Sequence, residues 1–434
     1  MDDAAVELDR YSVPQRLGDR AIRRFHVMAK PAGSACNLDC SYCFYLSKER
    51  LDGGLGLGHM RDEILERFVR DYITSVTGSE VVFSWQGGEP TLLGLGFFER
   101  VVALQRRYAK PGQRIENDLQ TNGTLLDEDW AQFLKRHRFL VGLSIDGPKD
   151  VHDAMRPTKR GQPSWDEVMR GLEHLKRHGV PFNTLTCVHR HNASRPLDVY
   201  RFLRREVGST YLQFIPIVEP RNFETSAPGS GSPADMPMLG SPRSKPGHPL
   251  SVVTPWSVDA EEYGYFLCKV WDEWLSRDLG KVLVAFCETL VVQRMGRPSQ
   301  VCVHAENCGK NVAIEHDGSV YACDHYVYPE FRRGNVNARS LGDMVFDPEQ
   351  VKFGYAKSET LPRYCRECAY LKDCWGECPK NRLLRDPHGE PGLNYLCAGF
   401  KRFFAHARRG ADALAAKITA APAAEPTIGA GAVR

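Results

Sequence analysis

The first 220 residues alternate short apolar runs with amphipathic stretches, and this alternation restricts the folds that the chain can adopt. Runs typical of buried strands lie at 25–30, 80–85, 114–120, 140–145, 182–188 and 211–218. Apolar residues at three- and four-residue spacing predict helices between them, at 61–76, 95–109, 127–137, 165–178 and 196–206. Strands that alternate with helices form parallel sheets with right-handed crossovers. Six such repeats predict an α/β fold, a partial (β/α)6 barrel of the TIM type.

Polar residues and glycines follow several of the predicted strands. The segments directly after the second, third and fourth strands are 86–90 (QGGEP), 120–123 (QTNG) and 144–147 (SIDG). Any turn between a strand and a helix favours Gly, Asn and Asp, so a single turn of this kind indicates little. In TIM-like barrels, however, chemistry gathers at the carboxyl ends of the strands. A succession of such turns therefore predicts a functional site at that face.

Three cysteines follow the first predicted strand. Cys36, Cys40 and Cys43 have the spacing C-x3-C-x2-C. Thiolates this close together are soft ligands that suit an iron–sulfur cluster or zinc. A closed structural zinc site takes four protein ligands, whereas a four-iron cluster held by three cysteines leaves one iron open. The number three therefore favours a cluster, with zinc as the alternative.

Eight further cysteines lie between residues 302 and 397. They are Cys302, Cys308, Cys323, Cys365, Cys368, Cys374, Cys378 and Cys397. Eight thiolates are enough for two sites of four ligands, and zinc ribbons are the alternative to clusters because they use similar spacings. Asp317-Gly318 predicts a tight hairpin turn between two short strands. The hairpin would place Cys323 and Asp324 at the end of its second strand.

Composition indicates an ordinary globular protein. The 434 residues are 42% hydrophobic and 26% charged, with a net charge of +3, so no nucleic-acid partner is expected. The acidic start lacks the features of a signal peptide, and no run approaches the ~20 apolar residues of a membrane span. We therefore expect a cytoplasmic protein without a membrane partner, whose fourteen cysteines ligate metal rather than form disulfides. The isolated Cys187, Cys268 and Cys287 are expected to be core residues.

The sequence divides into six predicted segments. Residues 1–22 form an N-terminal extension, 23–220 the barrel, and 221–256 an insertion rich in Pro, Gly and Ser. Such an insertion is typical of a flexible linker or surface loop, and no chemistry is assigned to it. Residues 257–300 form a helical connector that begins with an amphipathic helix at about 258–277. The cysteine-rich domain covers 301–407, and an alanine-rich tail, expected to be disordered, covers 408–434.

Taken together, the motifs resemble those of radical S-adenosylmethionine (SAM) enzymes with a SPASM extension. The three-cysteine loop, with Tyr42 before its last cysteine, resembles the cluster loop of that superfamily, and Gly87–Pro90 resembles its glycine-rich motif. The resemblance implies SAM and three 4Fe-4S clusters as cofactors. The SAM cluster would be held by Cys36, Cys40 and Cys43. The first auxiliary cluster would take Cys302, Cys308, Cys323 and Cys378, and the second Cys365, Cys368, Cys374 and Cys397.

A closer resemblance is to the anaerobic sulfatase-maturating enzymes. It is carried by the segments 83–92, 120–124, 141–148, 213–216 and 321–324, and it runs from about residue 25 to 407 apart from the insertion. Those enzymes oxidise a Cys or Ser, in a Cys/Ser-x-Pro-x-Arg segment of a sulfatase, to Cα-formylglycine. The resemblance implies two partners, an unfolded or nascent sulfatase and an electron donor such as flavodoxin or ferredoxin.

The same resemblance implies roles for individual residues. The SAM-site residues would be Tyr42, Gly88, Ser144, Arg156 and Leu212. Asp324 would be the base that takes the proton of the substrate thiol or hydroxyl, after a 5′-deoxyadenosyl radical has removed a β-hydrogen. Tyr45 and Gln86 would line the peptide pocket. An anionic cluster beside Asp324 is expected to raise the pKa of its carboxyl.

Two alternatives remain at this stage. One is a SPASM maturase that makes another side-chain modification or a crosslink in a peptide. The other is a zinc-stabilised peptide-binding module without redox chemistry.

Overall fold

A computed structural model describes residues 23–50 and 58–420, and within these residues ten strands form one sheet. Six parallel strands match the predicted ones: β1 (His26–Lys30), β2 (Glu80–Trp85), β3 (Arg114–Thr121), β4 (Leu140–Ser144), β5 (Phe182–Val188) and β6 (Tyr211–Pro216). A two-residue strand that was not predicted, β7 (Leu283–Val284), extends the sheet beside β6. The predicted partial barrel is confirmed.

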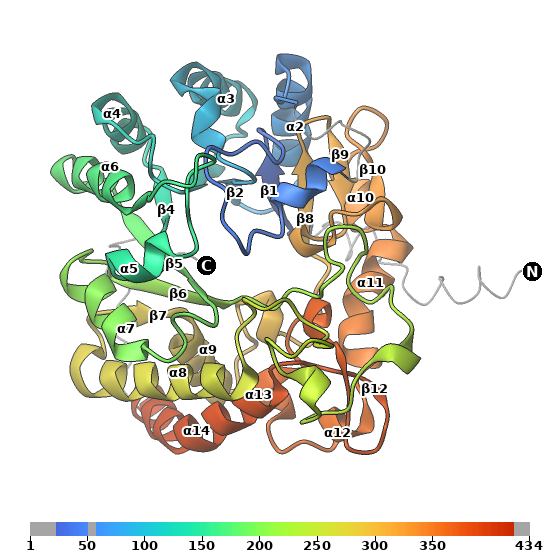
Figure 1. The fold of residues 1–434 in the computed structure, drawn as a ribbon. Coiled ribbons are helices and arrows are strands. Elements are labelled where there is room, and N and C mark those ends of the chain that lie inside the picture. Colours follow the sequence, from blue (N-terminus) through green and yellow to red (C-terminus); the bar gives the residue numbers. More distant parts are fainter. Residues whose placement is uncertain (1–22, 51–57, 421–434) are drawn as a thin grey trace, which may run out of the picture.

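Helices surround the curved sheet on its outer side (Figure 1). The helices of the barrel are α2 (Asp62–Ser75), α3 (Leu95–Tyr108), α4 (Glu128–Arg136), the short α5 (Lys149–Asp153), α6 (Trp165–Arg177) and α7 (Pro196–Arg205). Each long helix buries its apolar stripe against the strands, as in the aromatic cluster of Phe68, Phe83, Trp85 and Phe98. The start of α4 is fixed by Asp127, whose carboxylate accepts a hydrogen bond from the Trp130 backbone N–H at 2.9 Å. The five predicted helices are confirmed.

The C-terminal domain shares the sheet of the barrel. Its hairpin of β8 (Asn311–Glu315) and β9 (Ser319–Tyr321) is confirmed, and β10 (Arg332–Asn335) continues it. The sequence did not predict that β8 pairs in parallel with β1, in a register that sets Lys30 opposite Glu315. This pairing brings the end of the hairpin beside the loop that follows β1.

Short elements make up the rest of this domain. They are η7 (Cys302–His304), η8 (Asp324–Tyr326), η9 (Pro329–Phe331), α10 (Leu341–Val345), α11 (Pro348–Glu359), α12 (Arg363–Arg366), α13 (Leu371–Cys374), η10 (Pro379–Asn381), β11 (Leu384–Arg385) and β12 (Pro391–Leu393). In the barrel, the short helix η1 (Leu46–Arg50) lies in the segment that follows β1, and η3 (Pro90–Leu93) follows β2. The cysteines are therefore held mostly by short turns.

Three helices connect the two halves of the molecule. They are α8 (Ala260–Glu273), which continues as a π-helix at Trp274–Asp278, α9 (Ala285–Arg294) and α14 (Cys397–Ala420). Figure 1 shows α14 lying along α8, and a Cβ built on Gly399 would come within 2.1 Å of the Ala260 carbonyl oxygen. The prediction of a disordered tail from residue 408 is wrong as far as residue 420, because buried Ala411 and Ala415 hold this part of α14 against the core. Residues 1–22 and 421–434 lie outside the described residues.

The insertion at 221–256 is attached to the C-terminal domain. It contains two short helices, η4 (Pro233–Asp235) and η5 (Pro242–Ser244). The Leu239 N–H donates to the Arg385 carbonyl at 3.0 Å, and the Tyr328 hydroxyl donates to the Phe223 carbonyl at 2.6 Å. Of the two predicted alternatives, a surface loop agrees with these contacts and a flexible linker does not.

None of the helices within residues 23–50 and 58–420 combines the length and the apolar character needed to cross a bilayer.

Candidate active site and cluster-binding cysteines

The three-cysteine loop after β1 is held by the loops that follow β2 and β3. Backbone N–H groups of Gly88 and Glu89 donate to the carbonyls of Gly33 (2.9 Å) and Ala35 (2.8 Å). A Cβ on Gly88 would lie 1.9 Å from the Ala35 carbonyl oxygen, so only glycine permits this approach. The Asn122 amide donates to the Asn37 side chain at 2.8 Å. The carboxyl ends of three strands therefore meet at this loop.

The buried carboxylate of Glu89 connects these loops. It accepts hydrogen bonds from the hydroxyls of Thr91 (2.6 Å) and Thr121 (2.7 Å), and from the backbone N–H of Asn122 (2.7 Å). Burial raises the pKa of Glu89, and these donors act against the shift. The QGGEP and QTNG segments found in the sequence are thus parts of one hydrogen-bonded frame.

The three thiols of the loop lie close enough to affect one another. Burial, with smaller contributions from the charge of Glu89 and from a thiolate at Cys43, raises the pKa of Cys36 to about 12. Burial likewise raises the pKa of Cys40, to which ionised Cys36 and Cys43 both add. The Leu38 backbone N–H, 3.4 Å from the Cys36 sulfur, donates to it. Three adjacent buried thiols need a positive centre to stay ionised together, which an iron–sulfur cluster would provide.

Two of the predicted SAM residues, Tyr42 and Arg156, converge on buried Asp146. Arg156 donates to both Asp146 oxygens, from Nε at 2.8 Å and from Nη2 at 3.0 Å, and the Tyr42 hydroxyl donates at 2.5 Å. Burial alone would raise the pKa of Asp146, but Arg156 outweighs it and lowers the pKa to about 2. Arg156 is therefore a buried, paired guanidinium rather than a surface arginine.

Two more of the predicted SAM residues, Ser144 and Leu212, lie on strands of the barrel. Ser144 ends β4, and Leu212 is buried in β6, with β5 between the two strands. Trp256, at the end of the insertion, packs against the small cluster of Tyr42, Met155 and Ile217, and its indole N–H is buried without a hydrogen-bond partner among the described residues. A polar ligand would satisfy such an N–H, which fits SAM binding here. The sequence assigned no chemistry to the insertion, so it gave no signal for Trp256.

The predicted base and both predicted pocket residues meet at Lys30, the last residue of β1. The Lys30 ammonium forms an ion pair with Asp324, donates to Gln86 Oε1 at 3.2 Å, and lies 4.7 Å from the centre of the Tyr45 ring. The Tyr45 hydroxyl donates to Glu315. Sequence reasoning missed Lys30, although a single lysine that closes an apolar run at the carboxyl end of a strand is a usable signal.

The pKa of Asp324 departs from the expectation. Burial acts to raise it, but the charges of Lys30 and His325 outweigh burial, and the pKa lies below the ordinary value of an aspartate. The protein's own charges thus act in the direction opposite to the rise expected from an anionic cluster, and the sequence did not place Lys30 beside this carboxylate.

The four cysteines of the predicted first auxiliary site are electrostatic neighbours. Burial raises the pKa of Cys323 and of Cys378, and ionised Cys302 raises both further. Ionised Cys302 likewise raises the pKa of Cys308. The buried Lys357 ammonium donates to the carbonyls of Cys302 (2.8 Å) and Val303 (3.0 Å). A cation so placed favours thiolates, which suits cluster ligation.

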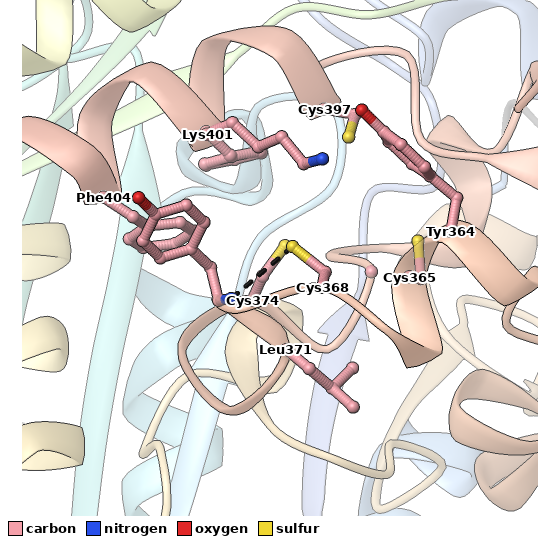
Figure 2. Close-up of a pocket in the computed structure, with 11 residues that line it drawn as sticks. Tyr364, Cys365, Cys368, Leu371, Cys374, Cys397, Lys401 and Phe404 are labelled. Carbon is pink, nitrogen blue, oxygen red and sulfur yellow. Dashed lines mark hydrogen bonds between the residues drawn. The ribbon is translucent and has the colours of Figure 1, made fainter. Parts of the chain in front are cut away.

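The four cysteines of the predicted second auxiliary site line one cavity. Figure 2 shows Cys365, Cys368, Cys374 and Cys397 around a space between α12, α13 and the start of α14. Its other lining residues are mostly aromatic or aliphatic: Tyr364, Tyr370, Leu371, Gly376, Phe400, Lys401 and Phe404. Within the described ranges, no three His, Cys, Asp or Glu side chains gather tightly enough to hold a single metal ion.

Comparison with known proteins gives the family. Residues 31–203 match the radical SAM superfamily, and 302–369 match an iron-sulfur cluster-binding domain. A serine-type anaerobic sulfatase-maturating enzyme of Bacteroides thetaiotaomicron is 42% identical over 88% of this chain and 89% of its own length. The chain belongs to the anaerobic sulfatase-maturating enzymes.

Further members of the family support the match. A cysteine-type anaerobic sulfatase-maturating enzyme of Clostridium perfringens is 33% identical over 88% of this chain and 95% of its own length. The solved structure of native anSMEcpe with bound AdoMet and a Cp18Cys peptide matches with a TM-score of 0.76 at 32% identity, covering 91% of this chain and 99% of that chain. These matches agree with a radical SAM fold that binds SAM and iron–sulfur clusters.

As a sulfatase-maturating enzyme of the radical SAM type, the chain is not a zinc-stabilised binding module. Cys268 and Cys287 are buried core residues, as expected. Cys187 differs, because it is half-buried, its sulfur lies 3.7 Å from Arg156 Nη2 and its backbone N–H donates to Asp146 at 2.9 Å. The sequence placed it in the core because its neighbours along the chain are apolar.

Proposed function

We propose that this chain oxidises a Cys or Ser, in a Cys/Ser-x-Pro-x-Arg segment of a sulfatase, to Cα-formylglycine. The observation that carries the proposal is the meeting of Asp324, Gln86 and Tyr45 beside the cysteine loop, at the seam where β8 pairs with β1. A base and a pocket at that place would face both the SAM site and the C-terminal cysteines. The relatives with this name span nearly the whole chain.

Three 4Fe-4S clusters and SAM would be the cofactors. Cys36, Cys40 and Cys43 would hold the SAM cluster, Cys302, Cys308, Cys323 and Cys378 the first auxiliary cluster, and Cys365, Cys368, Cys374 and Cys397 the second. When bound, SAM and these clusters supply a 5′-deoxyadenosyl radical that takes a β-hydrogen and sites that accept an electron. Tyr42, Gly88, Ser144, Arg156 and Leu212 would form the SAM site, where the Asp146 pair fixes Arg156 and Tyr42.

Asp324 would take the proton of the substrate. In the overall reaction the target residue loses a hydrogen atom from Cβ, a proton from its thiol or hydroxyl, and one electron, which is a two-electron oxidation. A Cys target also exchanges its sulfur for oxygen from water. The Asp324 side chain keeps 16% of its surface exposed, whereas the Lys30 side chain keeps 3%, so of the two charged groups Asp324 is the one that a peptide would meet. Gln86 and Tyr45 would orient that peptide.

The partners follow from this chemistry. A C-x-P-x-R segment must be extended and accessible, so we infer that an unfolded or nascent sulfatase is the substrate. The electron that starts each turnover would come from a flavodoxin or ferredoxin. We place the reaction in the cytoplasm, where nascent chains and such donors occur together.

The test is anaerobic incubation with SAM, dithionite and a peptide that contains Cys-x-Pro-x-Arg, beside a matched Ser peptide. Mass spectrometry should find an aldehyde at the target residue, with release of deoxyadenosine. The active protein should carry about twelve iron and twelve sulfide per chain. Deoxyadenosine release without any change at the target residue of either peptide would refute the proposal.

A further inference from the structure

Lys30 is the one residue that contacts the proposed base and both proposed pocket residues among the hydrogen bonds, ion pairs and ring contacts of residues 23–50 and 58–420. Its ammonium pairs with Asp324, donates to Gln86 and lies over the Tyr45 ring. These partners come from different places: Gln86 follows β2, Tyr45 lies beyond the cysteine loop, and Asp324 follows β9. Lys30 therefore connects the barrel side of the site with the C-terminal domain.

The sheet register fixes Lys30 in this place. Lys30 ends β1 and lies opposite Glu315, which ends β8 in the same parallel pair. The β8–β9 hairpin then returns the chain through Tyr321 to Cys323 and Asp324. Glu315 accepts a hydrogen bond from the Tyr45 hydroxyl. The last residues of both strands, Lys30 and Glu315, therefore contact residues of the proposed pocket. No rearrangement of a flexible loop is needed to bring the ammonium to the carboxylate.

Burial makes the pair sensitive to the loss of either partner. The Lys30 side chain is 3% exposed, and an ammonium so far from water requires a compensating charge. The same holds for the carboxylate, because its Oδ1 atom, which pairs with Lys30, is buried although the side chain as a whole is 16% exposed. The ion pair therefore sets which part of the carboxylate remains available to a substrate.

We propose that Lys30 is a positioning residue for the base: it holds the Asp324 carboxylate and ties it to Gln86 and Tyr45, so that the proton acceptor and the peptide pocket keep one relative orientation. The inference rests on the proposed function. Lys30 itself exchanges no proton or electron with the substrate in this scheme.

A double-mutant cycle of Lys30→Met and Asp324→Asn tests the inference. The measured quantity is aldehyde formed per deoxyadenosine released. We expect Lys30→Met to lower this ratio at least tenfold, and Lys30→Arg, which keeps the charge, to recover part of it. In the Asp324→Asn background, Lys30→Met should cause no further loss, because a positioning residue acts only through the group that it positions.

Thermal unfolding of the cofactor-loaded proteins gives a second readout that does not depend on turnover. Lys30→Met alone leaves a buried carboxylate unpaired and should lower Tm, whereas the double variant removes both charges and should recover stability. The control is Arg201→Met, which breaks the pair with Glu273 between α7 and α8, at 2.9 Å and away from the cysteines. Arg201→Met should leave the aldehyde ratio unchanged.

Three results would overturn the inference. The first is that Lys30→Met forms as much aldehyde per deoxyadenosine as the wild type. The second is that Lys30→Met lowers this ratio further in the Asp324→Asn background. The third is that Lys30→Met and the double variant both fail to fold while Asp324→Asn folds. Folding of the double variant when Lys30→Met alone does not fold supports it. Wild-type protein that releases deoxyadenosine but makes no aldehyde refutes the proposed function instead, so the two failures are distinguishable.

Discussion

The cysteine loop at residues 36–43 and the cavity lined by Cys365, Cys368, Cys374 and Cys397 are both suited to iron–sulfur clusters, yet their surroundings differ. The loop lies among polar and charged groups, with Asn122 beside Cys36 and the Arg156–Asp146 pair beside Cys40. The cavity is walled by aromatic and aliphatic side chains, with Lys401 as its one cation among the described lining residues (Figure 2).

The difference agrees with the function expected of each site, SAM binding at the loop and electron transfer at the cavity. A cluster that binds SAM needs polar groups around it to orient an amino group, a carboxylate and a sugar. A cluster that only passes electrons gains from an apolar wall, since burial and local charge set its reduction potential. In this chain, therefore, the residues around the cysteines distinguish the two sites better than the cysteines themselves do.

Removal of one cysteine from each site gives the largest expected effect. Cys36→Ala should reduce deoxyadenosine release below detection, because the loop would lose one of three ligands. Cys374→Ala should keep deoxyadenosine release and lose the aldehyde, because only electron transfer is affected. Anaerobic assays with iron analysis measure both products. Loss of SAM cleavage in Cys374→Ala with iron still bound at the loop would contradict this division of roles.

Substitution of Arg156 tests whether the charges around the loop are needed there. Arg156→Met leaves Asp146 buried and unpaired, which should cost about 3–5 kcal/mol in the free energy of unfolding. Exposed Arg177 provides the control, since Arg177→Met should change stability by less than about 0.5 kcal/mol. Denaturant unfolding and the KM for SAM are the measurements. Unchanged stability and KM in Arg156→Met would show that the loop does not depend on this pair.

The close approach of Gly88 to the loop predicts a smaller effect. Gly88→Ala would place a Cβ within 1.9 Å of the Ala35 carbonyl oxygen, and the strain should cost about 1–3 kcal/mol. Gly231→Ala is the matched control, because its Cβ would meet nothing within 4 Å. Equal unfolding free energies for the two variants would contradict the packing described for the loop.

The smallest expected effect concerns the cavity. The Lys401 side chain lines it, with Nζ 3.6 Å from the centre of the Tyr364 ring, and its charge lowers the pKa of Cys397 against the larger effect of burial. Lys401→Met should make the potential of a bound cluster more negative, on the order of tens of millivolts. Lys417→Met, on an exposed part of α14, should leave it unchanged. A reduction potential that shifts in Lys417→Met but not in Lys401→Met would argue against a cluster in this cavity. Redox titration measures the shift.

Much of the fold could be predicted from the sequence. The six parallel strands and five helices were predicted within a few residues, because each buries an apolar stripe or run that its own sequence displays. The Asp317-Gly318 turn correctly gave the hairpin. The last segment was expected to be a fraying helix that leads into a disordered tail, and its packing as far as residue 420 was not foreseen, because Ala411 and Ala415 are small residues whose burial depends on other elements.

The sequence by itself determined the barrel and the two groups of cysteines along the chain, since these depend on local periodicity and spacing. The chemical roles of single residues came from the resemblance to a known family. Only the tertiary structure decided that β8 pairs with β1, that Lys30 meets Asp324, Gln86 and Tyr45, and that Trp256 packs against the cluster that contains Tyr42. The physical reason is that such contacts join different elements of the chain, in several cases hundreds of residues apart, which local periodicity does not relate to one another. Which elements meet depends on which sheet edges still have unpaired backbone groups, and which apolar faces are still exposed, once the local helices and strands have formed.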